Sequence, residues 1–276
     1  MALPGDDVRH YNDAMMIQRT VPLLLALALL FQLACSSGEE LGVVSEVEGP
    51  IKTNCYLLYG LKSKEAAIVD AAGPLDDLAA FVEDNGLHVR YIFLTHAHWD
   101  HIEGIFDLIK KFPDAKVGIT EEEFAVMKDY TAFARESDPE RFEEVMRDSA
   151  MAKMIGVDLS AVKPDIFVKD GGEYRLGKRT IRAIFSPGHS AGSVCFACGD
   201  ILFSGDVLSR RSVGNTDFYK GSRKDQVESV RRLYGMFPDA TVVYPGHGQP
   251  TDIGSEKKEN KYVSAEGGLW GGQNKD

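Results

Sequence analysis

The sequence has little cysteine and little histidine, with four cysteines and seven histidines in 276 residues. Four cysteines spread over this length exclude a disulfide-rich scaffold, which needs more cysteines in a much shorter chain. Cys195 and Cys198 have the C-x-x-C spacing of zinc and redox sites, but no second pair accompanies them. Because they lie in the apolar, strand-like segment 193–198, we expect both to pack in the core, and a disulfide or redox role is the alternative.

Positive charge is also scarce, since 31 Lys and Arg stand against 42 Asp and Glu, a formal net charge of −11. Such an acidic surface repels phosphate backbones, so we expect no nucleic-acid partner. The composition, 44% hydrophobic and 26% charged, is that of an ordinary globular protein, and the length suits one large domain with appendages.

One long apolar run stands out near the N-terminus. Residues 21–34 (VPLLLALALLFQLA) are too short a run for a comfortable transmembrane helix and fit the apolar part of a signal peptide. A start at Met15 or Met16 would give the short basic segment that such a leader has, and the alternative is a buried helix of the domain. The sequence LACS around Cys35 resembles a bacterial lipobox, in which the cysteine becomes lipidated. We therefore expect residues 1–36 to be a leader and the protein to be exported in a bacterium, either periplasmic or anchored to the membrane as a lipoprotein.

Strand-like and helix-like segments alternate from residue 41 onward. We expect strands at 41–47, 53–59, 66–69, 89–94, 116–119 and 241–244, and hairpins at 173–184 and 193–203. We expect helices at 75–85, 105–112 and 224–237, and two helices within 121–155, divided near 138–139. Thr120 is the expected N-cap of the first of these two, with Glu123 completing a capping box.

The order of these elements predicts the fold class. Strands precede helices in each half of the chain, and hairpins are present, which favours an α/β (α+β) fold of two mixed sheets packed face to face and flanked by helices. We expect this domain to span residues 37–263 and the Gly-rich segment 264–276 to be a disordered tail.

Residues 95–101 (THAHWDH) directly follow an expected buried strand and hold three histidines and one carboxylate. Imidazole nitrogen and carboxylate oxygen suit zinc, and also iron or manganese. His96 and His98 can point to one side of such a loop while Asp100 and His101 reach another. The spacing therefore predicts two adjacent metal sites.

Three later segments share one design, in which an apolar strand is followed by a turn of small residues and one potential ligand. They are FSPGH ending at His189, FSGD ending at Asp206, and VYPGH ending at His247. Glycine lets the backbone bend close to a crowded centre, and proline stiffens the approach. A single such turn more often carries an exposed histidine. Only His10 and His88 remain outside these motifs, and we expect both at the surface.

HAHWDH, PGHSAGS, SGDVL and PGHG, in this order, resemble the metallo-β-lactamase superfamily over roughly residues 41–263. The resemblance implies an αββα sandwich with the site at one edge of the sheets. It also implies two divalent metal ions, with zinc expected and iron or manganese as alternatives. The implied ligands are His96, His98 and His189 for one metal, Asp100, His101 and His247 for the other, and Asp206 as the bridge.

Further details of the resemblance narrow the subfamily. A bridging Asp at position 206 is typical of glyoxalase II-like hydrolases, whereas many true metallo-β-lactamases have Cys or Ser near this point. Residues 212–221 and 254–262 resemble two segments of compact glyoxalase II-like proteins, with Asn215 in place of the usual Arg and Lys261 in place of a Pro. These departures weaken the case for glutathione thioesters as the substrate.

The resemblance implies hydrolysis of a thioester or similar acyl substrate, as in hydroxyacylglutathione hydrolase. Two adjacent divalent ions lower the pKa of a shared water from about 15.7 towards 7, so a metal-bridging hydroxide is available at neutral pH. Asp100 would bind metal and also orient this nucleophile. One alternative is a mononuclear-iron persulfide dioxygenase, whose iron ligands match His96, His189 and Asp206, and another is a lactonase or β-lactamase.

Other residues are candidates for supporting roles. Asp70, at the end of an expected strand, either accepts a proton from a ligand histidine or caps a turn. Lys257, Lys258 and Tyr262 are candidates for holding a substrate carboxylate, and the alternative for the lysines is a solvated charged face. The helical region 121–155 lies between the two groups of ligands in the sequence, where inserts in this fold often form the substrate wall.

Overall fold

The computed structural model describes residues 39–137, 139–145, 147 and 158–263. The expected leader, Cys35 and His10, and the expected tail at 264–276, lie outside the described residues, so the predictions about them stay predictions. Across the described ranges, no helix has the combination of length and apolar character needed to cross a bilayer.

The described strands form two mixed six-stranded sheets. The first sheet has the spatial order of the sequence: β1 (Leu41–Glu48), β2 (Thr53–Gly60), β3 (Glu65–Val69), β4 (His88–Phe93), β5 (Lys116–Ile119) and β6 (Ile166–Phe167). The second sheet runs in the reverse spatial order from β12 to β7: β7 (Glu173–Leu176), β8 (Arg179–Phe185), β9 (Val194–Cys198), β10 (Ile201–Gly205), β11 (Val242–Pro245) and β12 (Thr251–Asp252). Both expected hairpins are therefore confirmed as β7–β8 and β9–β10.

Helices follow or precede the strands in both halves. They are α1 (Asp76–Asp84), α2 (Trp99–Ile102), α3 (Ile105–Lys111), α4 (Glu121–Lys128), α5 (Tyr130–Ser137), α6 (Pro139–Val145), α8 (Arg223–Met236) and α9 (Ile253–Glu259), with a 3-10 turn at Leu159–Ala161. The sequence prediction missed α2, α9 and the short strands β6 and β12.

The expected boundary near 138–139 is confirmed, because α5 ends at Ser137 and α6 begins at Pro139. The expected number of two helices was wrong, because the chain also breaks at Asp129. Asp129 has a non-helical backbone, with φ −137° and ψ 61°. Its carboxylate accepts a hydrogen bond from the N–H of Ala132 at 3.1 Å. Asp favours this capping geometry over a helix interior, so one helix ends and a new one starts there.

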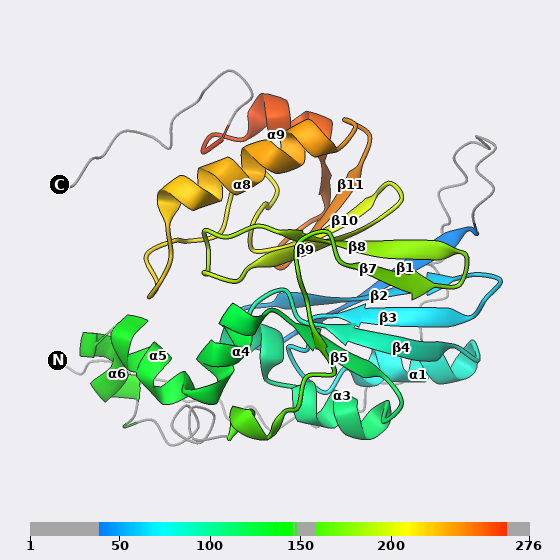
Figure 1. Cartoon of the computed structure of the whole chain (residues 1–276), viewed down its shortest axis with the longest axis horizontal. Helices are drawn as coiled ribbons and strands as arrows, with labels where there is room; N and C mark the ends of the chain where they lie inside the picture. Colours follow the sequence, from blue (N-terminus) through cyan, green and yellow to red (C-terminus); the bar gives the residue numbers. More distant parts are fainter. Residues whose placement is uncertain (1–38, 138, 146, 148–157, 264–276) are drawn as a thin grey trace, which may run out of the picture. The chain divides into compact units, whose positions relative to one another are not determined.

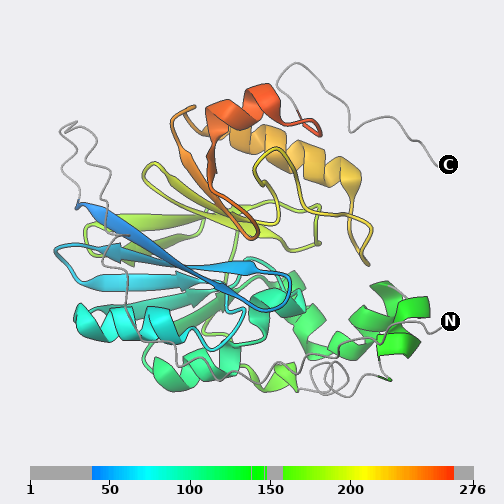
Figure 2. The same ribbon diagram turned by 180° about the vertical axis from the view of Figure 1, so that it is seen from behind.

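Apolar side chains of three clusters hold the layers together. Figures 1 and 2 show these layers of sheets and helices from opposite sides. Between the sheets, Phe93 of β4 stacks on Phe196 of β9 with ring centroids 4.6 Å apart. On the outer face of the second sheet, Leu202 packs with Leu233 of α8 and Ile253 of α9. Helices α1 and α3 contribute to a third cluster on the outer face of the first sheet. This arrangement confirms the αββα sandwich.

The two cysteines of the C-x-x-C pair are both core residues. Cys195 packs in the cluster under α8, and Cys198 packs in the cluster between the sheets, because residues three apart on a strand face opposite sides. Burial raises the pKa of the Cys195 thiol to about 12 and that of Cys198 to about 11. Both thiols are free, so core packing is confirmed and the disulfide alternative is wrong.

The strand directions bring the expected motifs to one edge of the sandwich. β3 and β4 run parallel, and so do β10 and β11, while β8 runs in the same direction as β10 because both pair antiparallel with β9. Asp70 and the 95–101 loop follow the first pair of strands. His189, Asp206 and His247 follow the other three. A backbone hydrogen bond from Val194 N to Thr95 O, 3.0 Å long, joins the two sheets at this edge.

Candidate metal centre

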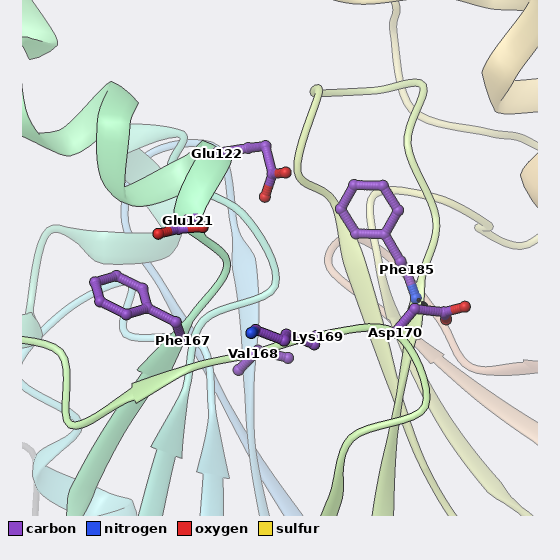
Figure 3. A pocket seen from close by; sticks show the side chains of 7 residues that line it. All are labelled: Glu121, Glu122, Phe167, Val168, Lys169, Asp170 and Phe185. Carbon is purple, nitrogen blue, oxygen red and sulfur yellow. Dashed lines mark hydrogen bonds between the residues drawn. The ribbon is translucent and has the colours of Figure 1, made fainter.

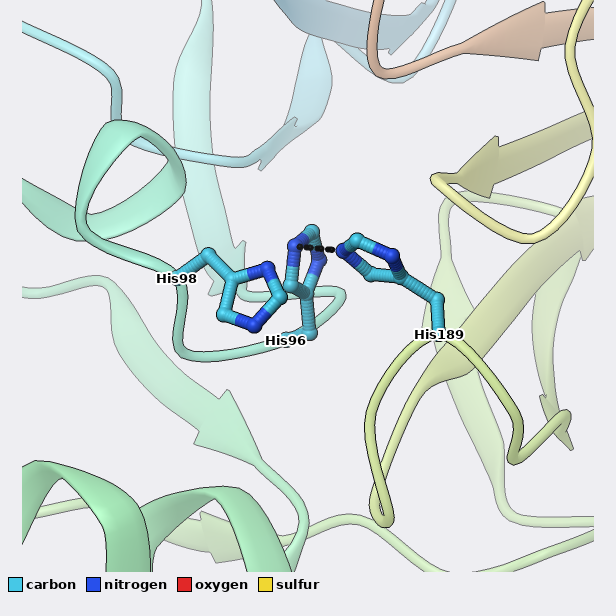
Figure 4. A group of neighbouring side chains, drawn as sticks. All are labelled: His96, His98 and His189. Atoms are coloured by element: carbon cyan, nitrogen blue, oxygen red, sulfur yellow. Dashed lines mark hydrogen bonds between the residues drawn. The ribbon is translucent and has the colours of Figure 1, made fainter. Parts of the chain in front are cut away.

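The seven residues expected to bind metal converge at this edge. Their side chains form three overlapping groups in which the candidate ligand atoms lie within 4.8 Å of one another. The groups are His96, His98 and His189; His96, His101 and Asp206; and Asp100, His101 and His247. Figure 4 shows His189, from the loop after β8, facing His96 and His98 from the loop after β4. The Nε2 atoms of His96 and His189 are 3.1 Å apart.

Asp206 lies between the two sets of histidines. Its Oδ2 is 3.6 Å from His189 Nε2 and 3.5 Å from His247 Nε2, and its Oδ1 is 3.6 Å from His101 Nε2. Asp100 Oδ2 lies 3.3 Å from the Nε2 atoms of both His101 and His247. The Asp206 carboxylate thus faces both halves of the centre, which is the position required of a bridging ligand.

Several polar atoms at the centre are buried without a partner. His98 Nε2, His101 Nε2 and Asp206 Oδ1 make no hydrogen bond to any described residue. Buried polar groups are nearly always paired, so convergent unpaired nitrogen and oxygen atoms fit a cation that they would share. The donor set therefore suits divalent zinc, iron or manganese, and the metal-binding roles of the individual residues stay a prediction.

Hydrogen bonds fix two of the imidazole rings with Nε2 towards the centre. His101 Nδ1 donates to Asp70 Oδ2 at 2.8 Å, and His189 Nδ1 donates to the backbone oxygen of Asn215 at 2.6 Å. Asp70 Oδ1 also accepts from the N–H of Thr95 at 2.8 Å. Such outer partners set the tautomer and orientation of a ligand histidine. Of the two interpretations of Asp70, the structure supports the one in which it serves a ligand histidine.

Charge and burial shift the pKa values at the centre in opposite directions. Burial, together with the neighbouring histidines, holds the pKa of His96 and His98 well below the usual range. Burial also opposes protonation of His101, but the carboxylates of Asp70, Asp206 and Asp100 outweigh it and raise its pKa to about 10. Burial would raise the pKa of Asp100, but His247, His101 and Thr53 lower it below its ordinary value. At neutral pH the metal-free centre thus combines neutral imidazoles at His96 and His98, a protonated His101 and an ionised Asp100.

The sequence prediction missed the role of Glu123. Thr120 caps α4 as expected, but the Glu123 carboxylate does not return to Thr120 in a capping box. Its Oε2 accepts from the N–H of Ala97 at 2.8 Å, and its Oε1 accepts from Ser190 Oγ and from the N–H of Gly192, both at 2.7 Å. Glu123 is 1% exposed. It therefore joins the loop of His96 and His98 to the loop of His189.

Two more supporting residues escaped sequence reasoning. The Thr53 hydroxyl at the start of β2 donates to Asp100 Oδ2 at 2.7 Å. Gly246 precedes His247, and a Cβ at that position would overlap Asp206 Oδ1 and His101 Cε1. Glycine is therefore required there for close approach of the backbone. The small-residue turn before His247 indicated that the glycine at 246 matters, whereas no local sequence pattern marks Thr53.

Aromatic side chains line one side of the centre. The Phe218 ring lies 4.8 Å from His98 and 5.8 Å from His189, measured between centroids. Phe133 of α5 lies 5.5 Å from His98 and 6.4 Å from Tyr219. Phe218 and Tyr219 are 39% and 38% exposed, although both are large and apolar. Helix α5 and the 218–219 loop therefore form an apolar wall beside the first group of histidines.

A pocket of about 480 Å³ lies beside the centre, and Asp206 and His247 contribute to its wall. A second pocket of about 310 Å³ lies between the start of α4, the segment after β6 and Phe185, and contains none of the seven expected ligands (Figure 3). Lys257 forms an ion pair with Asp239 at 2.6 Å. None of Lys257, Lys258 and Tyr262 lines the pocket beside the centre. The substrate role predicted for these three residues gains no support from their positions.

Comparisons with known proteins agree with this geometry. The chain is 30% identical to the probable metallo-hydrolase YqgX of Bacillus subtilis, over 78% of this chain and 94% of that protein. It is 29% identical to hydroxyacylglutathione hydrolase GloC of Haemophilus influenzae, over 77% and 93%. It is 28% identical to the human mitochondrial persulfide dioxygenase ETHE1, over 71% and 63%.

Solved structures show the same fold. The crystal structure of BLEG-1 B3 metallo-β-lactamase superposes with a TM-score of 0.67 at 30% identity, covering 80% of this chain and 99% of that one. TTHA1623 in a di-iron-bound form superposes with a TM-score of 0.63 at 27% identity, covering 80% and 100%. Residues 49–247 match the family model described as "Metallo-beta-lactamase superfamily". With its two-sheet sandwich and its cluster of histidines and aspartates, the chain belongs to the metallo-β-lactamase superfamily.

Proposed function

We propose that this chain is a binuclear metal-dependent hydrolase that cleaves thioesters or related acyl substrates. The position of Asp206 carries the proposal, because its two oxygens lie 3.5–3.6 Å from His189, His101 and His247. A carboxylate between two sets of imidazoles suits a pair of ions better than one ion. The similarity to GloC of Haemophilus influenzae, a hydroxyacylglutathione hydrolase, supports the reaction type.

Two divalent ions, when bound, would supply a nucleophile from water at neutral pH and an electrophile for the acyl carbonyl. His96, His98 and His189 would hold the first ion, and Asp100, His101 and His247 the second. We propose zinc as the metal, with iron or manganese as alternatives, since imidazole and carboxylate suit all three.

The chain's own residues set the conditions for this reaction. Thr53 donates to one oxygen of Asp100 and holds that carboxylate towards His101 and His247. Because the pKa of Asp100 is lowered, the group stays ionised at neutral pH and can accept a hydrogen bond that orients the attacking water. A thiolate leaving group has a low pKa and needs little protonation. The centre therefore needs no strong general acid for a thioester.

Asp206→Ala tests the proposal, with Asp200→Ala as the matched control. Asp200 is an exposed residue of the β9–β10 turn, so its substitution changes the net charge equally and leaves the centre intact. We expect Asp206→Ala to bind less than two equivalents of metal and to lose thioesterase activity by at least about 100-fold. If Asp206→Ala matches Asp200→Ala in both metal content and activity, the bridging role is wrong.

A second candidate function is that of a mononuclear-iron persulfide dioxygenase. His96, His189 and Asp206 lie close together, with Nε2 to Nε2 at 3.1 Å and His189 Nε2 to Asp206 Oδ2 at 3.6 Å. The similarity to human ETHE1 supports it. Protein purified anaerobically without chelators separates the two functions. One iron per chain and sulfite formation from glutathione persulfide would favour the dioxygenase, and two metals with thioester cleavage would favour the hydrolase.

A lactonase or β-lactamase activity is a further alternative, supported by the 30% identity to BLEG-1 B3 metallo-β-lactamase. Nitrocefin and acyl-homoserine lactones are the substrates that test it on the same preparation. Turnover of either one at a higher kcat/KM than that of any thioester would displace the thioesterase proposal.

We also propose that residues 1–36 direct export, with lipidation at Cys35 as one outcome and plain cleavage as the other. The 14-residue apolar run at 21–34 supports this. Metabolic labelling with a fatty acid, compared between the wild-type chain and Cys35→Ala, distinguishes the two outcomes. Export would separate the protein from the cytosolic glutathione pool, so its substrate would be another acyl compound.

A further inference from the structure

The pocket of about 480 Å³ beside Asp206 and His247 has one cationic side chain in its wall, Arg210. Arg210 is exposed and, within the described ranges, forms no ion pair or hydrogen bond. Its neighbour Arg211 is held by Glu256 at 2.6 Å and Glu259 at 2.7 Å. Arg210 is thus available to a ligand, whereas Arg211 is not.

Two amide side chains add donors to the same wall. Asn215 accepts a hydrogen bond from the N–H of Asp217 through Oδ1 at 3.1 Å, which leaves its NH₂ group as the free donor. Gln249 lines the pocket and makes no side-chain hydrogen bond to a described residue. A wall with one guanidinium and two amides is rich in donors, and planar guanidinium groups match carboxylates in a two-pronged geometry.

We propose that this pocket binds a carboxylate of the substrate and that Arg210 is its main contact. The substrate class is then an acyl thioester or ester that carries a carboxylate on the part that reaches past Asp206 and His247. This inference rests on the proposed hydrolase function for the covalent step. The pocket itself adds specificity, since a neutral analogue of the same shape leaves Arg210 without a partner.

A pair of isosteric thioesters tests the proposal on metal-loaded, full-length protein. The first is S-acetyl-3-mercaptopropionate, which carries a carboxylate, and the second is its neutral amide, S-acetyl-3-mercaptopropionamide. We compare Arg210→Gln with Arg231→Gln, because Arg231 is an exposed arginine of α8 outside the pocket and its substitution removes the same charge.

For the carboxylate substrate, we expect Arg210→Gln to raise KM about tenfold with kcat unchanged, as the loss of one charged hydrogen-bonding partner predicts. The KM of the neutral amide should stay the same, and Arg231→Gln should change neither value. An equal change for both substrates, or no change for the carboxylate, would overturn the proposal.

A binding measurement separates this proposal from the proposed function. 3-(Ethylthio)propionate keeps the carboxylate but has a thioether that cannot be hydrolysed, and calorimetry reports its Kd. We expect Arg210→Gln to weaken its binding about tenfold, with no effect of Arg231→Gln. If the wild-type chain cleaves neither thioester yet shows this binding pattern, the hydrolase function fails and the carboxylate pocket stands. If it cleaves both with equal KM, or if the thioether does not bind in an Arg210-dependent way, the pocket assignment is wrong and the hydrolase stands on its own evidence.

Discussion

Asp70→Asn should weaken metal binding at the half of the centre that contains His101. Asp70 has φ 66°, a left-handed conformation that Asn tolerates as well as Asp, so the substitution introduces no backbone strain. The two oxygens of Asp70 accept from Thr95 N and His101 Nδ1, both at 2.8 Å. An asparagine has only one oxygen, so it can keep only one of these bonds.

Both orientations of the new amide carry a cost. If its oxygen stays on Thr95 N, its NH₂ faces His101 Nδ1, and the imidazole proton must move to Nε2. That atom lies 3.3 Å from Asp100 Oδ2 and is the expected metal ligand. If the oxygen turns to His101, the N–H of Thr95 loses its partner in a buried place, which costs about 1–3 kcal/mol.

Outer partners of ligand histidines contribute about 10–100-fold to metal affinity. Loss of the Asp70 negative charge also lowers the pKa of His101 from about 10, so protons compete less with the metal for this imidazole. We therefore expect the lower end of that range, about tenfold weaker binding of one of the two metals, or about 1.4 kcal/mol.

The assay is zinc titration of the metal-free protein against a chromophoric chelator at pH 8. Asp165→Asn is the control, because Asp165 is exposed and accepts a backbone hydrogen bond from Val117 at 2.9 Å. Asp165→Asn thus removes the same negative charge from a carboxylate whose hydrogen bond is to the backbone and not to a histidine. Equal zinc affinity of Asp70→Asn and Asp165→Asn would refute the tautomer argument.

Four further outcomes follow from the structure. Glu123→Gln should lower the free energy of unfolding by about 1–2 kcal/mol relative to Glu122→Gln, measured by urea denaturation. Any amide orientation turns an NH₂ towards a backbone donor, and this loss exceeds the gain from removing a carboxylate whose burial raises its pKa. Equal stability of the two variants would contradict this. Gly246→Ala should abolish tight zinc binding, measured by chelator competition, because the new methyl group overlaps Asp206 and His101. Unchanged zinc binding would contradict the close approach of the Gly246 backbone to these two side chains. Zinc binding at pH 8 should release at least one proton per chain, seen as a dependence of the calorimetric heat on buffer, because the pKa of His101 is raised to about 10 in the metal-free fold. For the same reason, His101 stabilises the metal-free fold below pH 6.5, and this contribution should be lost as the pH rises towards 10.

Much of the fold and of the expected metal centre could be read from the sequence because the signals are local. His96, His98, Asp100 and His101 lie on one loop, and the three remaining ligand candidates each follow an apolar strand through a small-residue turn. Parallel strands end at a common edge, so motifs placed after strands meet there. The alternation of apolar residues likewise predicted most strands and both hairpins within one residue or two.

Other features depend on which segments meet in space, and only the tertiary structure decided them. Glu123 fits a capping box locally, but its carboxylate finds stronger partners in two loops 26 and 69 residues away in the sequence. Thr53 reaches Asp100 across 47 residues, and Lys257 pairs with Asp239 and not with a substrate pocket. A side chain's partner is set by long-range packing, and no local pattern encodes it. The sequence by itself therefore determined which residues could bind metal, whereas the packing of the two sheets decided which other side chains position and surround those candidate ligands.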